Sequence, residues 1–220
     1  RTAHQLVFGN LDIRLRALAQ LHILRNDAVP IIREYLDDPD PIVRETCIDT
    51  IVAGVERKYA VPMLRDHLKQ EEDTEVRYAI LKGLGNYRSR TGLKILTKHL
   101  KHKNEDLVII AIQSIVKLKT RTAAKPLIAC LEDPRWRVRV AALEAVGKLK
   151  LKTAADTVAG LLEDQDHFVR IKALDALTKL GSSDIVSRLK ALFHKDDAMK
   201  AMVVKALVSL DQPLPKKFYQ

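Results

Sequence analysis

Histidine and cysteine are the residues of this chain most able to hold a metal or act as a nucleophile, and their spacing favours neither role. His99 and His102 are close together in the sequence, but no further ligand accompanies them at the spacing of a metal site. Cys47 and Cys130 lie in different parts of the chain, and we expect both to be small buried hydrophobic residues in a reducing, cytoplasmic compartment. Glycine-rich phosphate loops are absent from the sequence. We therefore expect no metal, no cofactor and no enzymatic activity.

A cationic residue recurs at one position, directly after an apolar residue. The seven pairs are Ile13-Arg14, Val43-Arg44, Val76-Arg77, Leu107-Val108, Val138-Arg139, Val169-Arg170 and Met199-Lys200. The second residue of each pair is the marker position, and successive markers are 30, 33, 31, 31, 31 and 30 residues apart. A period of this length is typical of a solenoid, in which one two-element unit is stacked many times.

Acidic residues accompany the marker where the marker is arginine, with the exception of Arg14, which has Phe8 at the corresponding position. Asp38, Glu71, Asp133 and Asp164 lie six positions before Arg44, Arg77, Arg139 and Arg170, respectively. Where the marker is Val108, the acid is replaced by His102. This covariation predicts charge-assisted hydrogen bonds between turns and helices, within one repeat or between neighbours. We call these eight residues the arginine ladder and expect it to be structural, so that Arg139→Ala would leave Asp133 unpaired and lower stability.

Each repeat is predicted to contain a helix A, a turn, a helix B and a linker. The fifth repeat is the clearest, with helix A at 123–131, the turn at 132–134 and helix B at about 135–149. Apolar residues at helical spacing and the absence of strand alternation predict an all-α fold. We expect one continuous domain over 1–210, beginning with a truncated first repeat and followed by a tail at 211–220, where Pro213 and Pro215 prevent a helix.

The segments LEDPRWRVRVAALEAVGKL and LEDQDHFVRIKALDALTKLG resemble the short HEAT-like repeats named after phycobilisome lyases. The resemblance covers nearly all of 1–210 and implies a right-handed α-solenoid of about seven two-helix repeats, with the B helices on the concave side. It also implies bilin lyase activity as one alternative, although such repeats serve many roles. The deoxyhypusine hydroxylases, on a similar scaffold, bind iron through His-Glu pairs, and no histidine of this chain is followed by glutamate.

The face formed by the B helices, called the B-helix face below, is predicted to bind a partner. Its outward positions are acidic in the N-terminal repeats and mostly basic in the C-terminal ones, a mixture that fits a protein or peptide better than a uniform polyanion. Exposed aromatic residues and arginine are typical of interaction hot spots. The candidate binding residues are Tyr78, Trp136, Arg137, Phe168 and Lys172. The alternative is that Trp136 and Phe168 only fill the space between repeats.

The linkers between helix B and the next helix A are basic and recur at the repeat period. Their candidate residues, called the basic edge below, are Arg88, Arg90, Lys119, Arg121, Lys150 and Lys152. Stacked helices lie about 10 Å apart, so these cations are expected to form a row able to follow a nucleic acid or a layer of lipid headgroups. The alternative is that they only compensate the helix dipoles.

The net charge of +10 favours acidic partners, and no apolar run approaches the length of a membrane span. Our first hypothesis is a non-catalytic scaffold, a domain of a larger protein, that binds a protein or peptide and takes no small-molecule substrate. The second is nucleic-acid binding along the basic edge, with membrane-surface contact left open. The third is a bilin lyase subunit.

Overall fold

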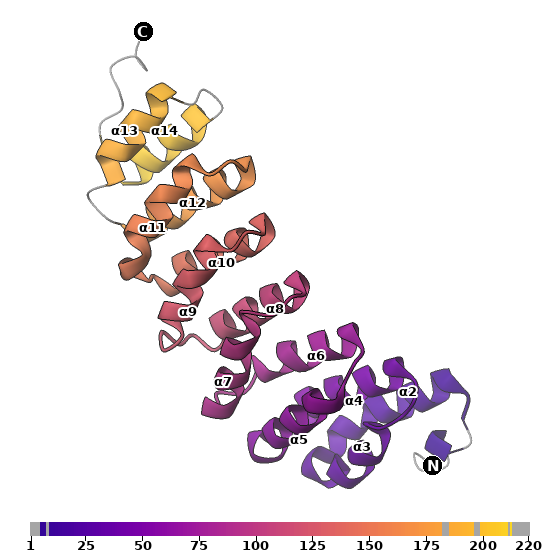
Figure 1. Ribbon diagram of the computed structural model, residues 1–220. Coiled ribbons are helices and arrows are strands. Elements are labelled where there is room, and N and C mark those ends of the chain that lie inside the picture. Colours follow the sequence, from indigo (N-terminus) through magenta and orange to yellow (C-terminus); the bar gives the residue numbers. More distant parts are fainter. Residues whose placement is uncertain (1–4, 8, 182–184, 196–198, 211, 213–220) are drawn as a thin grey trace. The chain divides into compact units, whose positions relative to one another are not determined.

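The computed structural model describes residues 5–7, 9–181, 185–195, 199–210 and 212, and the secondary structure of these residues is helical, without strands. Two compact units divide the chain, residues 1–118 and 119–220, and each is described by itself (Figure 1). A single domain over 1–210 stays a prediction. The predicted tail, except for Gln212, lies outside the described residues, as do residues 1–4 and 8 of the truncated first repeat.

The first unit contains helices in pairs that follow the predicted order. Its elements are α2 (Leu11–Gln20), a 3-10 segment (Leu21–Ala28), α3 (Val29–Tyr35), α4 (Pro41–Gly54), α5 (Arg57–Gln70), α6 (Thr74–Leu84), α7 (Arg90–His99) and α8 (Glu105–Lys117). The B helices α2, α4, α6 and α8 pack side by side in chain order, and the A helices α3, α5 and α7 pack against them.

The second unit repeats this arrangement, and its first two A helices are short. Its elements are α9 (Ala124–Ala129) with a 3-10 turn (Cys130–Glu132), α10 (Trp136–Leu149), a 3-10 turn (Lys152–Ala154), α11 (Ala155–Gly160) with a 3-10 turn (Leu161–Glu163), α12 (His167–Leu180), α13 (Ile185–Lys195) and α14 (Lys200–Ser209). The B helices α10, α12 and α14 are neighbours, with α10 and α12 in the most extensive contact. All seven marker positions therefore lie in helices, which confirms an all-α solenoid of two-helix repeats.

The core consists of aliphatic residues at the predicted repeat positions. Val43, Val76, Leu107, Val138, Val169 and Met199, which precede their markers, are buried, and so are Leu36, Leu68, Leu100, Leu131, Leu162 and Leu192 of the A helices. Ile13 in the first repeat is the exception, with 40% of its surface exposed. Burial of one apolar residue from each helix of a pair explains why the periodic pattern defines the stack.

Polar side chains define where the B helices begin. The carboxylates of Asp40, Asp73 and Asp166 and the amide oxygen of Asn104 accept hydrogen bonds from the first backbone N–H groups of α4, α6, α12 and α8. These groups have no partner inside a helix, so such caps each stabilise the helix by about 1 kcal/mol. Three of the acidic turns thus cap the B helix that follows them.

Three linkers begin with a residue in the left-handed backbone region. Lys119, Lys150 and Gly181 have φ angles of 52°, 50° and 64° and follow the ends of α8, α10 and α12. Glycine adopts this conformation without the steric cost that a side chain brings. The first lysine of two basic linkers is thus also the residue that ends a helix.

Candidate functional site

The arginine ladder joins each repeat to the one that follows it. Arg44 donates through Nε and Nη2 to the two carboxylate oxygens of Glu71, at 2.8 Å each, and through Nη1 to the backbone carbonyl of Asp38 at 2.9 Å. Glu71 belongs to the next turn along the chain, whereas Asp38 precedes Arg44 in its own repeat. The guanidinium group therefore ties its own turn, through the backbone, to the carboxylate of the following turn.

The two-pronged geometry recurs at Arg139, and Arg14 makes a single contact with the acid of the next turn through Nη2. Arg139 donates to both oxygens of Asp164 at 2.9 and 2.8 Å, and Arg14 pairs with Asp38. The expectation that Arg139→Ala would leave Asp133 unpaired is wrong, because Arg135 donates two hydrogen bonds to the carboxylate of Asp133. Arg139 reaches only the backbone carbonyl of Asp133, at 2.9 Å.

Glu71 is the most heavily bonded carboxylate of the ladder. It also accepts hydrogen bonds from His67 Nε2 and from the backbone N–H of Asp73. Burial acts to raise the pKa of Glu71, but the hydrogen bonds from Arg44 and Asp73 and the charge of Arg44 outweigh it and lower the pKa from 4.5 to about 2. Glu71 is therefore ionised throughout the neutral range.

The B-helix face of the second unit carries an exposed aromatic pair. Trp136 at the start of α10 and Phe168 at the start of α12 are 43% and 61% exposed, and their ring centroids lie 5.9 Å apart at 26°. Such stacked rings attract each other, yet a large part of the surface of both side chains remains in contact with water. The alternative that these residues only fill the space between repeats does not account for this exposure.

Polar residues surround the aromatic pair on the same two helices. Arg137 is exposed next to Trp136, and Lys172, one turn after Phe168, donates a hydrogen bond from Nζ to Glu144. The structure thus brings together four of the five predicted binding residues. Tyr78 is half-buried on α6 and belongs to the other unit.

The B-helix face of the first unit is acidic, as predicted. Glu45 is exposed on α4, and its pKa is raised by partial burial and then by the charges of Asp49 and Glu75. Asp49 and Glu75 are thus close enough to disfavour the ionised form of Glu45.

All six residues of the basic edge are exposed, and within the described residues none of them forms an ion pair. Two of them have backbone or capping roles, since Lys119 and Lys150 end helices. Arg121 Nε donates to the carbonyl of Leu149 at 3.2 Å, which connects neighbouring linkers of the second unit. Arg88 and Arg90 lie in the first unit, where the backbone carbonyl of Arg88 accepts a hydrogen bond from Arg57.

Both cysteines are buried as free thiols, as the sequence predicts. Burial raises the pKa of Cys47 to about 12 and that of Cys130 to about 11, so neither is a thiolate at neutral pH. In the described part of the chain, no group of three or more histidine, cysteine, aspartate or glutamate residues is placed to hold a metal ion. The rings of His99 and His102 are stacked, with centroids 5.8 Å apart.

The family model of HEAT repeats matches residues 29–116, 61–137 and 124–208. The chain belongs to the HEAT repeat family. Proteins of this family are typically non-catalytic scaffolds, which agrees with the ladder and core described above. No protein among the curated sequences matches the chain significantly.

Solved structures share the HEAT repeat fold at low sequence identity. The E. coli protein YibA has a TM-score of 0.61 and 17% identity, over 96% of this chain and 92% of that one. The complex of CpcE and CpcF of phycocyanin lyase from Nostoc sp. PCC7120 has a TM-score of 0.54 and 19% identity, over 98% and 88%. A designed armadillo repeat protein in complex with the peptide (KR)4 has a TM-score of 0.50 and 19% identity, over 81% and 98%. At these identities the likeness shows the fold alone.

Within the part of the chain that the structure describes, no helix combines the length and the apolar character needed to cross a membrane.

Proposed function

We propose that this HEAT repeat chain is a non-catalytic scaffold that binds a protein or peptide on the B-helix face of its second unit. The observation that carries the proposal is the exposed stack of Trp136 and Phe168. Binding hot spots are enriched in tryptophan and arginine, and they lie where an aromatic ring can be removed from water by a partner.

The neighbouring charges define the chemistry of the partner. Arg137 is exposed beside Trp136, and Lys172 holds the carboxylate of Glu144 within the same surface. A segment that combines an apolar side chain with an acidic one would cover the aromatic stack and meet Arg137. The designed armadillo protein in complex with the peptide (KR)4 supports peptide binding by a helical solenoid of comparable architecture, although that peptide is basic and the partner proposed here is acidic.

In the test, the wild-type protein and the double variant Trp136→Ala, Phe168→Ala are each used as bait to capture partners. The affinity of both proteins for each purified partner is then measured by calorimetry. Binding should weaken at least about tenfold, the loss expected when a hot-spot residue is removed. Tyr59→Ala is the matched control, since Tyr59 is also an exposed aromatic residue, 40% exposed on the A helix α5. A double variant that keeps the wild-type melting temperature and every partner at wild-type affinity would contradict the proposal.

A second candidate function is binding of nucleic acid along the basic edge. It is favoured by the exposure of all six cations and their lack of ion pairs among the described residues. Affinity for single- or double-stranded nucleic acid should then fall steeply with salt, and the slope should decrease when Lys150 and Lys152 are replaced by glutamine. Absence of binding at about 50 mM salt would exclude this function. The bilin lyase alternative rests on the likeness to CpcE and CpcF, and no nucleophile of this chain supports it.

A further inference from the structure

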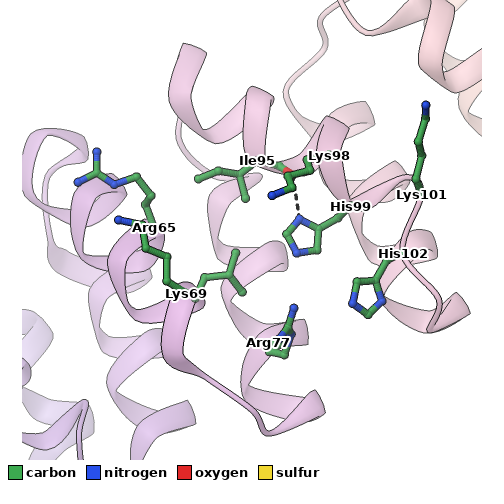
Figure 2. Close-up of a pocket in the computed structure, with 9 residues that line it drawn as sticks. Arg65, Lys69, Arg77, Ile95, Lys98, His99, Lys101 and His102 are labelled. Atoms are coloured by element: carbon green, nitrogen blue, oxygen red, sulfur yellow. Dashed lines mark hydrogen bonds between the residues drawn. The ribbon is translucent and has the colours of Figure 1, made fainter.

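A strongly cationic pocket lies in the first unit, where the A helices α5 and α7 meet the turn after α7 (Figure 2). Its volume is about 710 Å³. Five cationic residues line it, and no acidic residue does: Arg65, Lys69, Arg77, Lys98 and Lys101. His99 and His102 complete its polar wall. In Figure 2 the two imidazole rings lie close to Arg77, on the side of the pocket opposite Arg65 and Lys69.

The arginine ladder is interrupted in this pocket, at Arg77. Arg77 donates from Nη1 to the backbone carbonyl of Glu71 at 3.1 Å, as the other ladder arginines do within their own repeats. The carboxylate that should follow is missing, because position 102 is histidine. The spacing from Arg77 to His102 is 25 residues, the same as that from Arg139 to Asp164.

The Nε atom of Arg77 is buried and has no hydrogen-bond partner in the structure. Its Nη2 atom likewise forms no hydrogen bond with the described residues. In Arg44 and Arg139 these two nitrogens hold both oxygens of a carboxylate. The donor edge of Arg77 that corresponds to these two nitrogens therefore has no acceptor, and a buried donor without an acceptor is unfavourable.

His102 keeps one role of the acid that it replaces, acceptance of a hydrogen bond from the backbone, but it does not supply the negative charge. Its Nδ1 accepts a hydrogen bond from the backbone N–H of Asn104 at 3.0 Å, just as Asp164 Oδ1 accepts one from the N–H of Asp166 at 2.9 Å. The turn is thus preserved. The negative charge that would neutralise Arg77 is absent.

The remaining positive charge of the pocket is only partly neutralised by its surroundings. Arg65 and Lys69 share the carboxylate of Asp66. In the described part of the chain, Lys98 and Lys101 form no ion pair. Burial lowers the pKa of His99, and the charges of His102, Arg77 and Lys98 lower it further, against the opposing effect of its hydrogen bond to Ile95. The field in the pocket is therefore positive enough to disfavour another cation.

We propose that this pocket binds a phosphate group on the guanidinium edge of Arg77, after a small shift of the side chains that cover Nε, with the remaining charge facing Lys98. A phosphate matches the planar two-pronged donor of arginine as a carboxylate does, and it brings a second negative charge for the excess of cations. Leu68 and Ile95 supply apolar surface for the group that carries the phosphate. The site goes beyond the proposed scaffold function and lies in the other unit from the aromatic pair.

The phosphate can come from a small phosphorylated molecule or from a phosphorylated side chain of a protein. The experiment is calorimetric titration of the purified chain at low ionic strength in a phosphate-free buffer. Three probes separate the sources: inorganic phosphate, glycerol phosphate, and a phosphoserine peptide together with its unphosphorylated form. Binding of all three phosphate probes with similar affinity identifies a small-molecule site. A phosphopeptide that binds at least about tenfold more tightly than inorganic phosphate identifies a protein ligand.

Two variants and one control test whether the guanidinium group of Arg77 binds the phosphate. His102→Asp supplies the missing carboxylate, so phosphate affinity should fall at least about tenfold, and the melting temperature should rise. Lys98→Gln should weaken phosphate binding several-fold. Lys94→Gln removes an exposed lysine from the same helix, α7, outside the pocket and should leave affinity unchanged.

The proposal is overturned if the wild-type chain binds none of the phosphate probes, or if His102→Asp and Lys98→Gln bind phosphate as well as the wild type does. If His102→Asp does not fold, the comparison of Lys98→Gln with Lys94→Gln gives the decision. A second readout is the melting temperature with added phosphate, which should rise for the wild type and stay constant for His102→Asp.

Discussion

Arg44 and Glu71 form a two-pronged ion pair across a repeat junction, with both N–O distances at 2.8 Å and both side chains largely buried. The pair joins helix α4 to the turn that precedes α6. A partner removed from such a pair leaves the other charge without compensation in a poorly solvated place. The junction between these repeats therefore depends on both residues.

Glu71→Gln is expected to lower the free energy of unfolding by about 2–3 kcal/mol at pH 7, because Arg44 loses its charged acceptor. Arg33→Gln, an exposed arginine of α3, should change stability by less than about 0.5 kcal/mol. Urea unfolding followed by circular dichroism measures both values. Equal stability of the two variants would contradict the role given to the pair.

The same variant should also change the pH dependence of stability. The pKa of Glu71 is lowered in the folded state, from 4.5 to about 2, so the stabilisation is fully present above pH 4.5 and is lost as the pH falls through 2. The stability difference between wild type and Glu71→Gln should therefore shrink between these two pH values. A difference that stays constant from pH 7 to 2 would show that the charge of Glu71 contributes nothing.

Arg139 is paired with the turn that follows it and not with the carboxylate of its own turn. Double-mutant cycles can test this by measuring the coupling energy of Arg139 to each acid. The coupling energy between Arg139→Ala and Asp164→Ala should exceed about 1 kcal/mol, as is usual for residues in direct contact within a buried ion pair. The cycle of Arg139→Ala with Asp133→Ala should give a smaller value, because the carboxylate of Asp133 is bonded to Arg135. Coupling energies in the reverse order would contradict the geometry.

The aromatic pair should matter little for folding. Trp136→Ala combined with Phe168→Ala is expected to lower the free energy of unfolding by no more than about 1–1.5 kcal/mol, since both rings are already exposed and lose mainly their mutual stacking. Leu174→Ala, a buried residue of α12, should cost about 2–5 kcal/mol. Thermal and chemical unfolding of the three proteins give the comparison, and a large loss in the double variant would assign the pair to the core.

The left-handed backbone at Lys150 offers a stabilising substitution. Lys150→Gly should raise the free energy of unfolding by roughly 0.5–1 kcal/mol, because glycine adopts a φ of 50° without steric cost. Lys152→Gly, two residues further on and outside the left-handed region, should not stabilise the chain. An unchanged or lowered stability for Lys150→Gly would show that the lysine side chain contributes to this linker.

Much of the fold follows from the sequence because one physical requirement, burial of apolar residues at a fixed period, acts in every repeat. Leu131 and Val138 could be assigned to the core by counting from the marker, and the structure buries both. Counting from the marker position is therefore enough to assign these core positions.

The partners of the ladder could not be derived in the same way. Asp133 precedes Arg139 by six residues and Asp164 follows it by 25, and periodicity alone does not distinguish the two acids. Only the packing of consecutive turns shows that the guanidinium group reaches forward. The replacement of the acid by His102 was visible in the sequence, but its effect on Arg77 became clear only once this direction was known.

The direction of the ladder has a consequence for how the first unit opens. In this unit Arg14 and Arg44 pair with the carboxylate of the turn that follows, whereas no such bond joins Arg77 to the turn of His102. In a linear array, cooperativity depends on the coupling between neighbours. Amide hydrogens of α7 and α8 should therefore exchange through partial openings that leave α4 and α6 protected, which makes the junction after α6 a natural boundary between two cooperative blocks.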